Sequence, residues 1–139
     1  MDVTKLPFNH FIGLKLSDRK EYLLMLDKRS EYRNHLDTVH ASAQFALAEA
    51  TSGYFLLNEF SELTEIVPVV RKVETKYKKP ATGCVFSKAK FQETEKNEIF
   101  EALNQRGRAL IKVEVSLFDE TDALIMQSIF EWFVAKLQN

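Results

Sequence analysis

The pattern of hydrophobic and polar positions predicts one long buried helix in the middle of the chain. Nearly every position from Ala41 to Leu57 is small or apolar. A helix that is apolar on most of its sides lies inside a fold, so residues 39–60 are predicted to form a buried helix. At roughly 1.5 Å per residue it would be about 30 Å long, which is enough to cross a small domain. Thr38 is the predicted cap at its start.

Alternating apolar and polar residues predict strands on both sides of this helix. A short helical turn over residues 7–12, ended by Gly13, comes first. A second short helix is predicted over residues 93–106, where Gly107 ends an apolar stripe. The predicted strands cover about residues 12–16, 21–28, 67–78, 84–92, 109–117 and 123–136.

This order of elements predicts an α+β fold in which an antiparallel β-sheet wraps around a long central α-helix. The strands alternate, so one face of the sheet is covered and the long apolar helix is the obvious cover. We find no internal repeat, linker or low-complexity segment, and residues 1–139 are therefore expected to form a single domain.

Composition and charge exclude several functional classes. The chain has 139 residues, of which 45% are hydrophobic and 28% charged, with a formal net charge of −1. This balance gives no sign of a nucleic acid or an anionic membrane as the main partner. The single cysteine, Cys84, excludes an intramolecular disulfide and favours a cytoplasmic setting. We expect no signal peptide and no membrane-spanning segment.

One ionisable residue, Glu49, lies in the middle of the apolar helix. A carboxylate there is costly unless it is paired, hydrated or protonated, which makes Glu49 a candidate catalytic acid. An isolated glutamate on a helix is more often a solvated surface residue, but the apolar surroundings favour a chemical role. Two other candidate residues also have a purely structural alternative. His40 could simply begin the helix, and Asn34 could simply hold a turn.

The spacing of these residues resembles that of the hotdog-fold thioesterases, most closely the phenylacetyl-CoA-thioesterase-like branch and its uncharacterised relatives. That family has an asparagine, a histidine six residues later and an acid nine residues after the histidine, as in Asn34, His40 and Glu49. The turn at residues 78–83 and the Phe118–Glu120 turn before a last strand with a tryptophan also fit. The likeness extends from about Gly13 to Val134, and it implies a hotdog fold.

The resemblance also implies an activity, the hydrolysis of an acyl-CoA thioester to a free acid and coenzyme A. Glu49 would be the general base or the nucleophile, and the residues alone leave both roles open. Asn34 and His40 would belong to the catalytic set, and the backbone N–H groups of Ala41 and Ser42 would bind the oxyanion.

Further residues are candidates for substrate binding. Phe45 and Ser52 share the helix face of Glu49, while Lys78 and Lys79 are candidates for the phosphates of coenzyme A. No metal is expected, and no cofactor beyond the coenzyme A of the substrate. The resemblance places the site at the interface of a homodimer, and a dimer of dimers stays open. Strands with apolar residues on both faces also predict an interface between subunits.

Two departures from the family leave a second reading open. The family usually has His-Gly-Gly where this chain has His40-Ala41-Ser42, and the helix predicted over residues 93–106 replaces a tight hairpin. A hotdog protein that binds acyl-CoA or a lipid-like ligand without turnover is therefore the alternative. A hotdog dehydratase is disfavoured, because residues 34–43 contain neither proline nor glycine.

Overall fold

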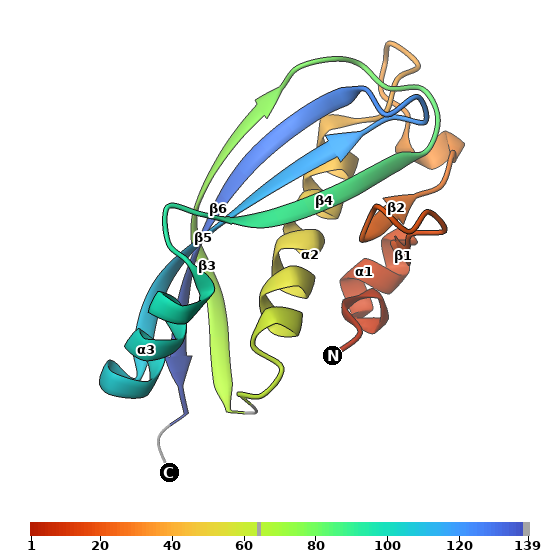
Figure 1. Ribbon diagram of the computed structural model, residues 1–139. Coiled ribbons are helices and arrows are strands. Elements are labelled where there is room, and N and C mark those ends of the chain that lie inside the picture. The colour runs from red at the N-terminus through yellow and green to blue at the C-terminus, as the bar shows by residue number, and fades with distance from the viewer. Residues whose placement is uncertain (64, 138–139) are drawn as a thin grey trace.

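An antiparallel sheet of six strands curves around one long helix, α2 (Ala41–Glu59), in the computed structural model of the protein (Figure 1). The structure describes residues 1–63 and 65–137. The strands lie in the order β1 (Lys15–Leu16), β2 (Leu24–Leu26), β4 (Val85–Gln92), β5 (Arg108–Phe118), β6 (Leu124–Lys136) and β3 (Ile66–Tyr77). The remaining helices are α1 (Pro7–Ile12) and α3 (Lys96–Arg106), and short 3-10 turns cover Val3–Lys5 and Ser30–Tyr32. The predicted α+β class, with a sheet around a central helix, is confirmed.

The concave face of the sheet is buried against α2. Every second residue of β5 is fully buried there, from Ile111 to Leu117, and its neighbours Lys112 and Glu114 point away from the helix. On β6, Trp132 packs against Gly53 of the helix, where an added Cβ would lie 3.5 Å from the indole ring. The predicted alternation is therefore confirmed for β5, where one face is removed from water. β3 differs, because it has no fully buried residue and its Val67 and Val69 are exposed.

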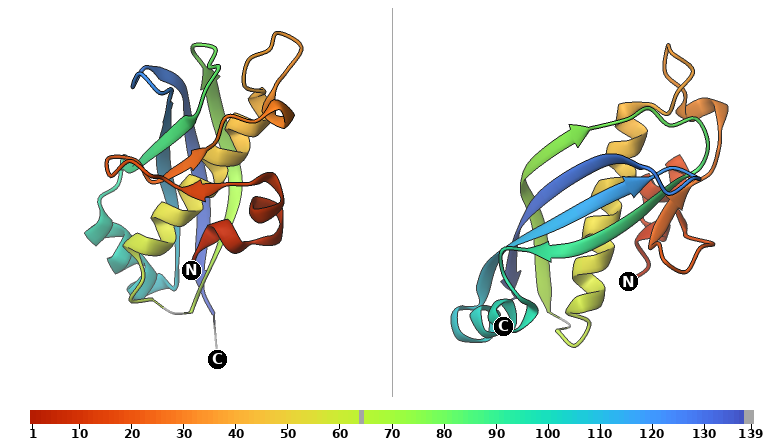
Figure 2. Two further views of the ribbon diagram at one scale, coloured as in Figure 1. Left: turned by 90° about the vertical axis from the view of Figure 1, so that its right-hand side faces the viewer. Right: turned by 45° about the horizontal axis from the view of Figure 1, so that its top comes forward.

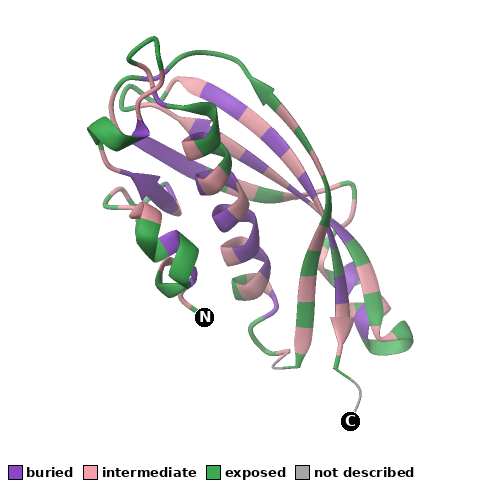
Figure 3. Cartoon of the chain, turned by 180° about the vertical axis from the view of Figure 1, so that it is seen from behind, coloured by how far each residue is buried: buried purple, intermediate pink, exposed green. Residues whose placement is uncertain are grey.

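The single sheet curls around more than one side of the helix. Strands β4, β5, β6 and β3 pass on one side, while α1 and the short strands β1 and β2 lie on the other (Figures 1 and 2). Seen from behind, the buried residues of α2 and of the strands face one another (Figure 3). Among the described residues, no helix is long and apolar enough to cross a membrane.

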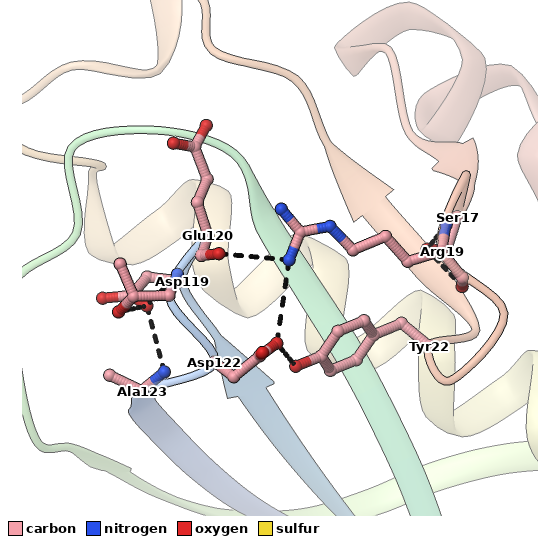
Figure 4. A network of polar contacts seen from close by, with 8 residues as sticks. Ser17, Arg19, Tyr22, Asp119, Glu120, Asp122 and Ala123 are labelled. Atoms are coloured by element: carbon pink, nitrogen blue, oxygen red, sulfur yellow. Dashed lines mark hydrogen bonds and ion pairs between the residues drawn. The ribbon is translucent and has the colours of Figure 1, made fainter.

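The first two strands are much shorter than the sequence pattern predicts. Only two residues of β1 and three of β2 pair in the sheet. The chain between them is also held by side chains, at the turn that joins β5 to β6 (Figure 4). The guanidinium of Arg19 donates to the Glu120 carbonyl oxygen at 3.1 Å, and the Tyr22 hydroxyl donates to the Asp122 carboxylate. Burial is the larger cause and this bond to Asp122 the smaller cause that raise the pKa of Tyr22 to about 12.

Both predicted short helices are present. α3 begins at Lys96 and ends at Gly107, whose backbone has the left-handed φ of 73° that glycine adopts without strain. Its residues Ile99 and Leu103 are buried, and the helix contacts β5. α1 has the predicted bounds, so the inserted helix and the first helix were both readable from apolar spacing and terminal glycines.

Candidate active site

The loop before α2 is closed by the side chain of Asn34. Its Oδ1 accepts from the backbone N–H of Leu36 at 2.9 Å and of Thr38 at 3.1 Å. Its Nδ2 donates to the Thr38 hydroxyl at 2.9 Å. The amide is therefore occupied inside its own turn, and the role that the structure shows for Asn34 is to position the loop.

His40, and not Thr38, caps the start of α2. Its Nδ1 accepts from the backbone N–H of Ser42 at 2.9 Å, and its own backbone N–H donates to the Tyr32 carbonyl oxygen at 2.7 Å. The predicted cap Thr38 is wrong, because Thr38 is bonded to Asn34 two residues before the cap position. A ring nitrogen that accepts here places the proton of a neutral imidazole on Nε2.

This cap changes which backbone donors are free at the helix start. The N–H of Ser42 is already bonded to His40, so it cannot also serve an oxyanion without losing the cap. The N–H groups of Ala41 and Ala43 have no acceptor among the described residues. Free N–H groups in a first helical turn attract negative charge. The predicted oxyanion role of Ala41 and Ser42 stays a prediction, and the free N–H groups in this first turn are those of Ala41 and Ala43.

Glu49 lies two turns further along α2 and is partly buried. Within the described chain, its carboxylate makes neither a hydrogen bond nor an ion pair, and burial alone raises the pKa of Glu49. Spacing along the helix puts it on the same face as Ser42 and Ala46, both of which keep some exposure to solvent. A carboxylate without a partner beside an accessible helix face is the arrangement expected of a general base or a nucleophile.

The four predicted substrate-binding residues lie in different environments. Ser52 is fully buried, accepts from the Trp132 indole N–H at 3.2 Å and donates to the Glu49 carbonyl oxygen. Its hydroxyl is therefore committed to packing α2 against β6, which contradicts the predicted contact with substrate. Phe45 keeps 37% of its surface exposed beside Phe130, so it stays available.

Lys78 and Lys79 follow the end of β3, next to the start of α2. The Tyr77 hydroxyl donates to the Ala41 carbonyl oxygen at 3.2 Å, which joins the strand end to the helix start. Lys78 donates to the Gln127 side chain at 3.0 Å, and Lys79 lies 4.0 Å from Asp119. The two lysines thus lie at the same end of the fold as the helix start, while their contact with a phosphate stays a prediction.

Sequence reasoning missed Ala43 and Tyr32. Tyr32 supplies the carbonyl that fixes His40, and Ala43 supplies a free N–H. No local signal identifies either residue, because each gains its role from a contact made by the folded backbone.

Comparison with known proteins identifies the family. Residues 13–134 match the model described as a domain of unknown function, DUF4442. The chain belongs to this family. A comparison of this DUF4442 chain with curated proteins found no match.

Solved structures show the fold of the DUF4442 chain. A Pseudomonas aeruginosa protein named a probable thioesterase is 22% identical with a TM-score of 0.81, over 97% of this chain and 91% of its own. A candidate thioesterase from Shewanella oneidensis is 20% identical with a TM-score of 0.76, over 96% and 91%. A Bacillus halodurans protein with CoA is 16% identical with a TM-score of 0.64, over 80% and 69%. The fold is the hotdog fold, as predicted.

The cap at His40 can be tested through stability. His40→Ala removes the acceptor for the Ser42 N–H and is expected to lower the free energy of unfolding by roughly 0.5–2 kcal/mol. His40→Asn supplies another capping oxygen and should restore most of that loss. Urea denaturation measures both variants. Equal stability of His40→Ala and wild type would show that the imidazole does not cap α2.

The raised pKa of Glu49 predicts a pH-dependent stability. Burial favours the protonated carboxyl of Glu49. Its contribution to the free energy of unfolding is therefore fully present below the ordinary pKa of 4.5, and this contribution is lost as pH rises through the raised pKa. Glutamine cannot ionise, so Glu49→Gln should melt at a higher temperature than wild type at about pH 7, and the gap should close in acid. Glu62→Gln, at an exposed position after α2, is the control and should show no such gap.

Proposed function

We propose that this protein is an acyl-CoA thioesterase with Glu49 as its general base or nucleophile. The observation that carries the proposal is the unpartnered Glu49 carboxylate on a helix whose start offers the free N–H groups of Ala41 and Ala43. The hotdog fold supports it, because structures of the same fold include proteins named as thioesterases and one that holds CoA.

In the proposed reaction, the thioester carbonyl oxygen accepts hydrogen bonds from the N–H groups of Ala41 and Ala43. These donors stabilise the negative charge that develops on this oxygen in the transition state. Glu49 either removes a proton from the attacking water or attacks the carbonyl carbon itself, giving an anhydride that water then hydrolyses. The C–S bond breaks, coenzyme A leaves as its thiol, and the acyl group leaves as the carboxylic acid.

The length of α2 argues that two copies of the chain build each site. Ala41 and Glu49 are eight residues apart, which is about 12 Å along a helix axis. Reacting atoms must approach to about 3–3.5 Å, so the carboxylate of one chain is poorly placed for a carbonyl held at the start of its own helix. We therefore propose that Glu49 of one copy serves the helix start of another.

β3 is the edge through which a second copy is proposed to pair. In the described chain it pairs with β6 on one side only, so the backbone groups of its other side are open to another strand. It also lies beside the start of α2 through the bond from Tyr77. Light scattering at micromolar concentration should give the mass of a dimer or of a dimer of dimers. A monomer under these conditions would contradict the shared site.

The second candidate function is binding of acyl-CoA or a lipid-like ligand without hydrolysis. Two features favour it. Residues 41 and 42 are alanine and serine, where the thioesterases that the sequence resembles usually have glycines, and the Ser42 N–H is bonded to His40. The two candidates differ in one measurable outcome, which is turnover of a bound thioester.

Hydrolysis of a panel of acyl-CoA thioesters, followed by release of thiol, tests the proposal. Glu49→Gln is expected to lower kcat at least about 100-fold on the best substrate, because glutamine cannot accept the proton or form the anhydride. Glu62→Gln is the matched control and should keep the wild-type rate.

The outcomes separate the candidates. An unchanged rate in Glu49→Gln would remove Glu49 from the mechanism. Micromolar binding of acyl-CoA by the wild type, with no thiol released from any thioester in the panel, would favour the second candidate.

A further inference from the structure

A cavity of about 590 Å³ lies between α1 and the start of α2. Its apolar walls are Phe11, Ile12, Leu26, Tyr32 and Ala43. Sites for small organic ligands have volumes of about 300–1,000 Å³ and mostly apolar walls, so this cavity has the size and the lining of a ligand site. His40 and Ser42 also line it, which places it directly at the helix start that carries the free N–H groups.

The wall formed by α1 is fixed in place. The Tyr32 hydroxyl donates to the Ile12 carbonyl oxygen, and the buried Asn9 amide donates to the Val3 carbonyl oxygen at 2.9 Å. Gly13 ends the helix with a φ of 81°, and an added Cβ there would lie 2.5 Å from the Arg29 guanidinium. The helix is therefore held against the loop that leads to α2.

Phe11 lies near the end of this helix. Its side chain is 83% exposed although it lines an apolar cavity. Holding a phenyl ring in water forgoes the free energy that burial would give, roughly 1.5–3 kcal/mol for a fully buried large apolar side chain. An apolar ligand in the cavity would cover part of this ring. The exposure of Phe11 and the apolar cavity beside it thus point to the same kind of occupant.

The charges at the cavity define that occupant further. Arg29 and Glu31 are its two charged residues, both are exposed, and their formal charges cancel. An acyl group that ends in a carboxylate or an amine would therefore meet no net opposite charge in the cavity. A neutral, apolar acyl group matches the lining better.

We propose that the cavity receives the acyl group of the thioester and that Phe11 is a specificity-determining residue which selects bulky apolar acyl groups over acetyl. The inference rests on the proposed thioesterase function and names its substrate class. With the carbonyl at the N–H groups of Ala41 and Ala43, the acyl group extends past Ala43 into the cavity, and the coenzyme A portion extends away from it.

Phe11→Ala tests the proposal, with Phe8→Ala as the matched control. Phe8 lies on the same helix and is 64% exposed, but it does not line the cavity. KM and kcat are measured for acetyl-CoA, hexanoyl-CoA and benzoyl-CoA. Wild type should have a lower KM for hexanoyl-CoA and benzoyl-CoA than for acetyl-CoA. Phe11→Ala should raise the first two KM values about tenfold, equivalent to about 1.4 kcal/mol, and leave that of acetyl-CoA unchanged. Phe8→Ala should match wild type on all three.

A binding measurement separates failure of this inference from failure of the proposed function. Calorimetric titration compares the Kd of hexanoyl-CoA with that of coenzyme A alone, in proteins carrying Glu49→Gln. Tighter binding of hexanoyl-CoA that is lost on adding Phe11→Ala supports the acyl cavity even if no thioester is hydrolysed. Hydrolysis with equal KM values in Phe11→Ala and Phe8→Ala, or a wild type that prefers acetyl-CoA, would overturn the inference and leave the thioesterase function standing.

Discussion

The packing of α2 into the concave face of the sheet is the constraint on which the rest of the structure depends. The helix is enclosed by strands on one side and by α1 with the first two strands on the other. Residues such as Leu47, Ala48 and Leu56 are fully buried, and Gly53 leaves room for the Trp132 ring. Much of the helix is committed to packing. The face with Ser42, Ala46 and Glu49 stays open to a ligand or a second chain, as do Ala43 and Phe45 near the helix start.

That commitment also explains the two features of the candidate site. Burial without a partner raises the pKa of Glu49, so the same environment that disfavours its charge keeps it available for proton transfer. The loop before the helix start satisfies its own hydrogen-bonding groups through Asn34 and Thr38, so it leaves the helix start accessible. His40 then takes one N–H of the first turn and leaves those of Ala41 and Ala43 unused. The acid and the donors are thus products of one helix, although its length keeps them apart within a chain.

The short N-terminal elements contribute in a different way from the long strands. Their ladder is short, and bonds from Arg19 and Tyr22 to the turn between β5 and β6 add to it (Figure 4). The bond from the Tyr32 hydroxyl to the Ile12 carbonyl oxygen holds the end of α1 beside the loop that leads to α2. The wall of the cavity, and with it the proposed preference for apolar acyl groups, therefore depends on contacts between residues that are distant in the sequence.

The sequence by itself determined the long elements and the acid. Periods of two and of about 3.6 residues are local properties, so β3 to β6, α2 and α3 follow from the order of apolar residues, as does the oddity of Glu49 in an apolar helix. Tertiary structure decided the rest. Only the fold shows that β1 and β2 are a few residues long. It also shows that Ser52 accepts a hydrogen bond from Trp132, and that His40 rather than Thr38 caps the helix. It alone also places Phe11 beside a cavity at the helix start. Each of these depends on which distant groups meet to satisfy a hydrogen bond or bury a surface, and local spacing carries no information about such meetings.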